Sequence, residues 1–314
     1  MTAPASLAKS ALFVGDCSWD TTLFVDRMPD PDEKLFTSRT VESAGGVAAN
    51  AAVACVRAGV PARAWLSLGD DAAGQAVRAQ LGGDRVTVAA TCVPGPTCRC
   101  VIILEPGGEK RLLLSPGASM YPAAELVRTA SLDGIGWMHT VVYDPRTGGE
   151  AVARCRERGI PWSLDLEPAT FEAGIAALGA SLRGAAVVFC NSRAAAKLGP
   201  DPAAALAAFG VQAVVLTCGA AGATWRCGAE RAFAAPDASI AGGPIIDTTG
   251  AGDCLAAWFI AETLCGADPV TALRSAVTAA TLSCSAAGAQ PAFPTRTTLD
   301  ALYGARRSTV GKVA

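Results

Sequence analysis

Asp247-Thr-Thr-Gly-Ala-Gly-Asp253 is a polar, glycine-rich turn that leads directly into the apolar segment Cys254-Leu-Ala-Ala-Trp-Phe-Ile-Ala261. The first N–H groups of a helix lack intrahelical acceptors and carry a partial positive charge. Gly250, Ala251 and Gly252 have little or no side chain, so an anionic group can approach their amides closely. The stretch therefore predicts an anion-binding turn for a phosphate or for a phosphoryl group in transfer.

Asp253 falls in the first turn of the predicted helix, beside the expected anion. Because a carboxylate repels phosphate, its presence favours a second task, which is to hold and deprotonate an attacking hydroxyl group. A helix N-terminus stabilises the ionised carboxylate, so we expect a weak base. Phosphoryl transfer tolerates a weak base because its loose transition state asks for little early proton removal. The alternative interpretation is a helix-capping aspartate after a glycine turn.

Composition narrows the classes of protein that could carry this turn. The 314 residues are 51% hydrophobic and 17% charged with a net charge of −2, so the chain can bury a full core and lacks the basic excess of nucleic-acid binders. We expect no membrane span, because long uncharged apolar runs are missing. Twelve scattered cysteines and one histidine predict reduced, buried thiols rather than a metal centre. The N-terminal apolar run, residues 11–14, is too short for a signal peptide, so we expect a cytoplasmic protein.

The order of segments predicts an α/β fold. From about residue 135 onward, short β-branched runs alternate with alanine-rich helical stretches, which is typical of a parallel sheet flanked by crossover helices. Half-polar extended segments precede them, and two of these flank the turn Glu105-Pro-Gly-Gly108. We expect one domain over residues 1–314, with a small β-sheet lid from about residues 16–44 and 96–118. Exposed lid strands predict a homodimer in which the two lids cover each other's edges.

Other signatures for nucleotides and for nucleophilic catalysis are missing from the sequence. It contains neither G-x-x-x-x-G-K-[ST] nor G-x-S-x-G. The pair Gly250 and Gly252 is followed by Leu255, where a dinucleotide fingerprint requires Gly or Ala. A Rossmann oxidoreductase shares the α/β pattern but would lack its glycine fingerprint.

Five motifs, in order over roughly residues 11–295, resemble those of the PfkB carbohydrate kinases in the ribokinase-like superfamily. They are the string at 247–253, Gly45-Gly-Val-Ala-Ala-Asn50, Leu68-Gly-Asp-Asp71, Thr217-Cys-Gly-Ala-Ala-Gly222 and Gly288-Ala-Gln-Pro-Ala-Phe-Pro294. The resemblance implies a three-layer sandwich with a mainly parallel central sheet. It also implies an ATP-dependent kinase that uses Mg²⁺ and phosphorylates a hydroxyl group of a sugar or sugar derivative.

The resemblance implies roles for groups of residues. The catalytic group is the base Asp253 with an anion hole of Gly250, Ala251 and Gly252. The substrate-binding group lies after the first strand and at the double glycine, and comprises Asp16, Ser18, Asp20, Gly45, Gly46 and Asn50. The nucleotide contacts lie at the ends of later strands and comprise Asn191, Thr217, Gly219 and Gly222. A K⁺ site is implied at Asp247, Thr249 and Gly288. For Asn50 a helix cap is an equal alternative.

Position along the chain adds two expected substrate contacts. Arg99 lies on a lid strand and, if it points inward, would bind an anionic substituent; the alternative is a charge that protects an exposed edge strand. Asp144 follows a predicted strand at its carboxyl end, where α/β sheets place ligands; the alternative is a turn that starts a helix.

Several positions depart from the family pattern. Ala194 stands where the family places a magnesium-organising Glu, so another carboxylate would have to substitute. Ser18 and Val47 replace residues of ribokinases proper, which argues against ribose as the substrate, and Ala292 replaces a Ser that completes the cation site. Two alternatives stay open: a nucleoside kinase of the same fold, with Trp19 near the acceptor, and a ligand-sensing member without catalysis.

Overall fold

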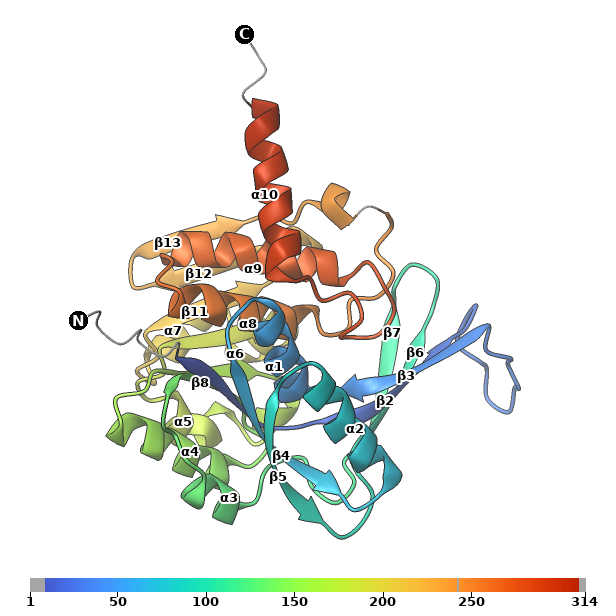
Figure 1. Ribbon diagram of the computed structural model, residues 1–314, viewed down its shortest axis with the longest axis horizontal. Coiled ribbons are helices and arrows are strands. Elements are labelled where there is room, and N and C mark those ends of the chain that lie inside the picture. The colour runs from blue at the N-terminus through green and yellow to red at the C-terminus, as the bar shows by residue number, and fades with distance from the viewer. Residues whose placement is uncertain (1–8, 242, 311–314) are drawn as a thin grey trace, which may run out of the picture.

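The computed structural model describes residues 9–241 and 243–310; the rest of the predicted domain, residues 1–8, 242 and 311–314, lies outside them. Its body is a nine-stranded sheet between two layers of helices, and a separate four-stranded sheet projects from one side (Figure 1). The predicted α/β fold with a mostly parallel central sheet and a small second sheet is therefore confirmed.

The large sheet has the strand order β13-β12-β11-β10-β9-β8-β1-β4-β5. All its pairs are parallel except β11–β12 and β12–β13, which are antiparallel and form one edge. The strands are β1 (Ser10–Val14), β4 (Ala62–Gly69), β5 (Thr87–Val93), β8 (Ile135–Val141), β9 (Trp162–Leu166), β10 (Val187–Asn191), β11 (Ala213–Thr217), β12 (Ala223–Cys227) and β13 (Glu230–Ala234). Strands β8 and β9 are buried along their whole length, as expected when helices cover both faces.

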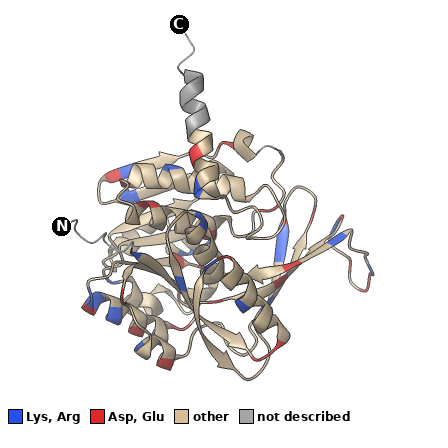
Figure 2. Ribbon diagram, viewed as in Figure 1, with Lys and Arg blue, Asp and Glu red and all other residues tan. Residues whose placement is uncertain are grey.

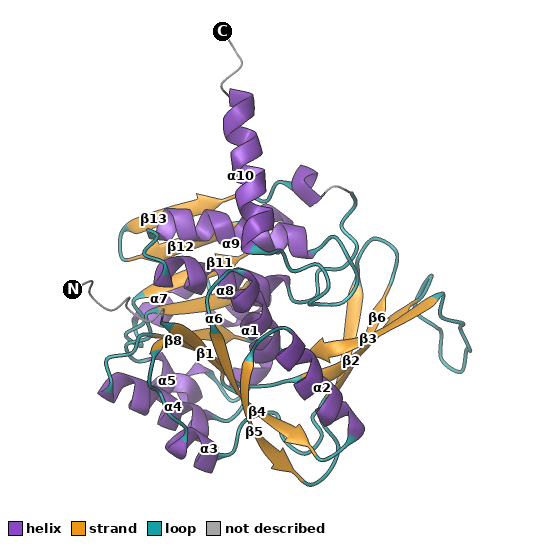
Figure 3. Cartoon of the chain, in the orientation of Figure 1, coloured by secondary structure: helices purple, strands orange, loops and turns teal. Residues whose placement is uncertain are grey.

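Helices cover both faces of the large sheet (Figure 3). One layer packs into the larger hydrophobic core and consists of α1 (Val47–Arg57), α2 (Ala72–Gly83), α8 (Ala251–Leu264) and α9 (Pro269–Ser283). The other layer consists of α3 (Ala124–Thr129), α4 (Pro145–Glu157), α5 (Gly179–Leu182), α6 (Ser192–Leu198) and α7 (Pro202–Ala207). Helix α8 is apolar on every side because it packs against both α1 and α9, and its Trp258 is fully buried.

Short elements and the C-terminal helix complete the described chain. The 3₁₀ turns are η1 (Pro168–Phe171), η2 (Ile175–Leu178), η3 (Gly219–Ala221) and η4 (Ala238–Ala241). Helix α10 (Arg296–Val310) extends away from the body (Figure 1).

The small sheet, which we call the lid, has the order β3-β2-β6-β7. Its strands are β2 (Ser18–Phe24), β3 (Arg39–Gly45), β6 (Arg99–Leu104) and β7 (Lys110–Ser115), which fall within the predicted segments apart from the last residue of β3. Strand β6 alternates between buried and more exposed residues, whereas the edge strand β7 leaves Leu112, Leu113 and Leu114 largely exposed.

The charged residues and the cysteines are distributed as the composition predicts. Lysine and arginine positions are interspersed with aspartate and glutamate along the chain (Figure 2). Within the described residues, no helix combines the length and the apolar character that a bilayer span requires. The twelve cysteines are free thiols, and most of them are buried, as small apolar side chains would be.

Candidate active site

Four acidic side chains lie toward the edge of the large sheet where its parallel strands end, within range of one another's charges. Asp16 follows β1, Asp165 and Glu167 lie at the end of β9, and Asp253 lies in the first turn of α8. Burial raises the pKa of Asp16 to about 6, and it also raises the pKa values of Asp165 and Glu167. The Asp16 charge adds to the rise at both Asp165 and Glu167, so these groups oppose one another's ionisation. This edge concentrates carboxyl groups that favour a proton or a cation.

Asp253 is the most strongly perturbed of these groups for which a value is resolved. Its pKa is raised from the ordinary 3.8 to about 8, mainly by burial and also by the charges of Asp16 and Glu167, against a hydrogen bond from Asn50. The expectation of a weak base is therefore wrong, because desolvation and neighbouring charges outweigh the helix N-terminus. A carboxylate with a pKa near 8 is a stronger base, close to the range that favours proton transfer at neutral pH.

A chain of side-chain amides holds the Asp253 carboxylate. Asn50 Nδ2 donates to Asp253 Oδ2 over 2.8 Å, and Gln290 Nε2 donates to Asn50 Oδ1 over 3.0 Å. Gln80 Nε2 in turn donates to Gln290 Oε1 over 2.8 Å. Asn50 thus lies within α1 and makes no helix cap. Sequence reasoning missed both glutamines; Gln290 lies inside the quoted 288–294 motif, whereas no sequence signal points to Gln80.

The glycine turn before Asp253 has two distinct kinds of glycine. Gly250 has a φ of 75°, and a Cβ atom there would lie 2.8 Å from the Cβ of Ala289, so the position requires glycine. A Cβ atom at Gly252 would meet no atom within 4 Å, so the backbone there is open. The Ala251 amide donates to the Thr248 carbonyl oxygen over 3.3 Å. The predicted three-amide anion hole therefore has one amide already engaged within the turn.

A cavity of about 320 Å³ opens beside Gly252. Its walls are mostly small and apolar and include Gly219, Ala220, Gly222, Ala251, Leu255, Val277 and Ala280. Gly222 has a φ of 93°, and a Cβ atom there would lie 2.3 Å from the Ala234 carbonyl oxygen, so this glycine lets β13 pass close to the turn. Thr217 lines a separate cavity of about 250 Å³ with Ser192 and Cys218. The structure thus brings Gly219 and Gly222 to the Gly252 cavity and leaves Thr217 outside it.

Asp20 is buried at the other side of the site, in lid strand β2. Burial raises its pKa to about 6, against a hydrogen bond donated by the Ser18 hydroxyl group. A Cβ atom at Gly45 would lie 2.0 Å from Asp20 Oδ2, and one at Gly46, where φ is 94°, would lie 2.5 Å from the Cys17 Cα atom. The double glycine therefore makes room for the protein's own carboxylate and backbone, and its contact with the substrate stays a prediction.

The Asp16 side chain contacts the N-terminal end of helix α1. Its carboxylate accepts hydrogen bonds from the amides of Val47 at 3.2 Å and Ala48 at 3.3 Å. These bonds satisfy two amides at the helix N-terminus. Asp16 therefore joins the end of β1 to α1, the helix that carries Asn50.

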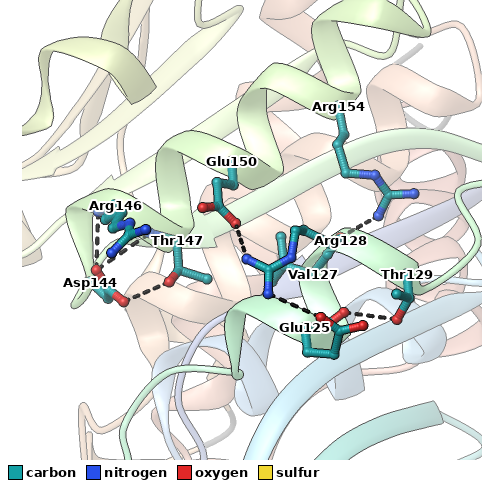
Figure 4. Close-up of polar contacts among 9 residues, drawn as sticks. All are labelled: Glu125, Val127, Arg128, Thr129, Asp144, Arg146, Thr147, Glu150 and Arg154. Carbon is teal, nitrogen blue, oxygen red and sulfur yellow. Dashed lines mark hydrogen bonds and ion pairs between the residues drawn. The ribbon is translucent and has the colours of Figure 1, made fainter.

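Three other predicted contacts have side chains engaged in local structure. Asp144 caps α4, accepting from the Thr147 hydroxyl at 2.6 Å and from two backbone amides (Figure 4), so the helix-start alternative accounts for it. Asn191 caps α6 and donates to Glu167 Oε1 at 3.4 Å. Arg99 is half-exposed and pairs with Asp71 at 3.7 Å. None of these contacts places the residue against the Asp253 carboxylate.

Lys110 reaches the glycine turn from the lid. Its Nζ atom donates to Thr249 Oγ1 over 3.1 Å and lies 4.0 Å from Asp247 Oδ1. Burial lowers the pKa of Lys110, while the charges of Asp247 and Asp253 oppose that shift. Sequence reasoning did not identify this lysine, because its contact depends on how the lid folds over the body.

Comparison with known proteins places the chain among kinases. The pfkB family of carbohydrate kinases matches residues 8–296. An ATP-dependent ribose-1-phosphate kinase from Halopiger xanaduensis is 28% identical over 90% of this chain and 94% of its own length. A ribokinase from Bacillus subtilis is 27% identical over 92% of this chain and 97% of its own. The structure of a ribokinase from Giardia lamblia covers 95% of this chain and 99% of its own, with a TM-score of 0.83 at 19% identity.

Proposed function

The chain belongs to the pfkB family of carbohydrate kinases, and we propose that it transfers the γ-phosphate of ATP to a hydroxyl group of a small sugar derivative, with Asp253 as the general base. One observation carries the residue assignment. The Asp253 carboxylate is fixed by Asn50 in the first turn of α8, immediately after the open backbone of Gly252 and its cavity. This arrangement supports the proposal that a proton acceptor and a phosphate-binding turn lie side by side.

Three residues of the site have different roles in the proposed reaction. Asp253 accepts the proton of the acceptor hydroxyl as the phosphorus–oxygen bond forms, and the ADP oxygen leaves on the opposite side of the phosphoryl group. The amide of Gly252, where the backbone is open, and the N-terminal end of α8 stabilise the charge on the transferring group. Asp20, buried beside Ser18, accepts hydrogen bonds from the hydroxyl groups of the acceptor.

Magnesium would enter with ATP, whose phosphate charge it neutralises. Among the described residues, no three acidic, histidine or cysteine side chains are placed to hold a metal ion by themselves. The carboxylate of Glu167 accepts a hydrogen bond from Asn191, which ends β10 and directly precedes α6, the helix in which Ala194 replaces the family's Glu. Its raised pKa, which arises from burial and from Asp16, fits a group that would gain from a nearby cation. We assign Glu167 as the substitute carboxylate.

The acceptor is expected to be a sugar or a sugar phosphate. A nucleoside acceptor would need a stacking surface for its base, and the candidate Trp19 packs against the main hydrophobic core. The test is a coupled ADP-release assay over pentoses, hexoses, sugar phosphates and nucleosides. We expect turnover with a sugar or sugar phosphate and a loss of about 10²–10⁴-fold in kcat for Asp253→Asn. The exposed carboxylate variant Asp133→Asn is the control and should keep full activity. Near-normal turnover by Asp253→Asn would refute the assignment.

We further propose a cytoplasmic homodimer that pairs through the lid. The edge strand β7 exposes Leu112, Leu113 and Leu114 by 53%, 64% and 47%. Consecutive exposed leucines on an edge strand invite pairing with a second copy, which would cover both the apolar side chains and the free backbone groups. The many free thiols suit a reducing compartment.

A further inference from the structure

Lys110 places a positive charge beneath the turn that precedes Asp253. It is the first residue of β7, and its side chain is only 22% exposed, although the rest of that strand faces outward. The ammonium group donates to the Thr249 hydroxyl at 3.1 Å. A lysine that turns inward from an exposed strand gives up hydration, so its contacts in the turn must compensate for that loss.

Asp247 is the counter-charge of this lysine. Its carboxylate is fully buried, and Oδ1 accepts from the Thr249 amide at 2.8 Å and from the Thr249 hydroxyl at 2.6 Å. Oδ2 accepts from the Gly288 amide at 2.9 Å. Within the described part of the chain, Lys110 makes the one ion pair of this carboxylate, at 4.0 Å. A buried carboxylate without a cation nearby is costly, so the lysine supplies a necessary charge.

These contacts do not fit a potassium ion in the same place. The Thr249 hydroxyl oxygen already accepts a hydrogen bond from the Lys110 ammonium group, and the same group lies 4.0 Å from Asp247 Oδ1. A hard cation is held by oxygen ligands, and the ammonium group occupies the side of these two oxygens that such a cation would need. The residues expected to hold K⁺ thus lie around the positively charged ammonium group of Lys110.

We propose that the Lys110 ammonium replaces a monovalent cation beneath the anion-binding turn, and that the lid delivers it. This inference rests on the proposed kinase function. The hairpin before Lys110 already lies against the turn, since a Cβ atom at Gly108 would be 3.7 Å from the Ile246 carbonyl oxygen. Lys110 is a positioning residue that acts through Thr249 and Asp247, and phosphoryl transfer in this protein requires no K⁺.

Thermal melting tests the proposal without any acceptor. Lys110→Met and Lys110→Gln are compared with wild type and with Lys34→Met, which removes an exposed lysine from the lid loop 25–38. Each protein is melted in chloride salts of potassium, lithium and choline at equal ionic strength. We expect K⁺ alone to raise the melting temperature of both Lys110 variants, because the vacated oxygens can then hold it. Wild type and Lys34→Met should melt equally in all three salts.

Kinetics supply the second measurement. Wild-type kcat should change by less than about twofold when choline replaces K⁺, whereas the Lys110 variants should lose about tenfold in choline and recover part of it in K⁺. A wild-type enzyme that requires K⁺ would overturn the inference, as would variants that respond to K⁺ in neither measurement. If no acceptor is phosphorylated at all, the kinase proposal fails, but the melting result still decides whether Lys110 holds a cation's place.

Discussion

Replacing Asp253 by Asn should stabilise the protein increasingly as the pH rises. The pKa of Asp253 is raised from 3.8 to about 8 by burial and by the charges of Asp16 and Glu167. Between these two pH values the unfolded chain has released the proton and the folded chain still holds it, so the wild type loses stability as the pH increases. Asparagine has no proton to lose. The difference in stability between Asp253→Asn and wild type should therefore grow from about pH 4 to pH 8 and level off above.

The size of this effect follows from the same pKa. From pH 5 to pH 8 the linkage covers three pH units, which corresponds to a ceiling of about 4 kcal/mol. Asp253 is only partly buried, so we expect about 1–2 kcal/mol, or a melting temperature gain of about 2–6 °C. Melting curves of the two proteins from pH 5 to pH 9, without ligands, measure it directly.

A matched control separates this effect from general surface changes. The pKa of Asp133 is lowered by hydrogen bonds from Ser131 and Arg158, so this exposed carboxylate stays ionised over the whole range. The Asp133→Asn difference should therefore be constant between pH 5 and pH 9. If the Asp253→Asn difference were also constant, or if this variant were less stable than wild type at pH 9, the raised pKa would be refuted.

Four further predictions concern the residues around this carboxylate and the lid edge. Asn50→Leu removes the 2.8 Å hydrogen bond that lowers the pKa of Asp253. The acidic limb of the plot of kcat/KM against pH should therefore move to higher pH by about one pH unit. An acidic limb at the wild-type pH would show that this bond does not affect the base. Gly250→Ala strains a left-handed position and should destabilise the protein by about 1–3 kcal/mol in denaturant melts. Gly252→Ala meets no neighbour and should weaken ATP binding in calorimetry at unchanged stability. Leu113→Lys should shift sedimentation from dimer to monomer, and a wild type that already sediments as a monomer contradicts the lid interface.

The order of layers could be predicted from sequence, but some strands could not. Strand β4 contains Arg63, Ser67 and several alanines, so it lacks the β-branched run that marks its neighbours. Strand β8 begins at Ile135, well before the β-branched run that starts at Thr140. The polar ring of His139 interrupts the apolar pattern in the first part of β8. The ring is nevertheless buried inside the strand, with Nδ1 2.8 Å from the Ser163 hydroxyl. Tertiary burial on both faces overrides the local pattern in such strands.

The residues of the candidate site could likewise be predicted from sequence only in part. Motifs located Asp253, Asn50 and the glycine turn, because these residues act through local geometry. Motifs did not locate Glu167 or Lys110, whose contributions depend on where another strand ends and where the lid lies. Glu167 could have been found by the rule that selected Asp144, since both follow a strand at its carboxyl end. The fold must be known before the amide chain through Gln80 and Gln290 becomes visible.

The strength of the proposed base is set by distant segments rather than by its own helix. The first turn of α8 would stabilise the ionised carboxylate of Asp253, but burial by the surrounding segments, together with the charges of two carboxylates that follow other strands, opposes it and prevails. Removing Asp16 or Glu167 would therefore weaken the base while relieving repulsion in the empty site. The same residues that make proton transfer possible near neutral pH make the unliganded protein less stable at alkaline pH. A site optimised for stability would lack these acidic groups, so their presence at the ends of β1 and β9 is itself an argument that chemistry takes place there.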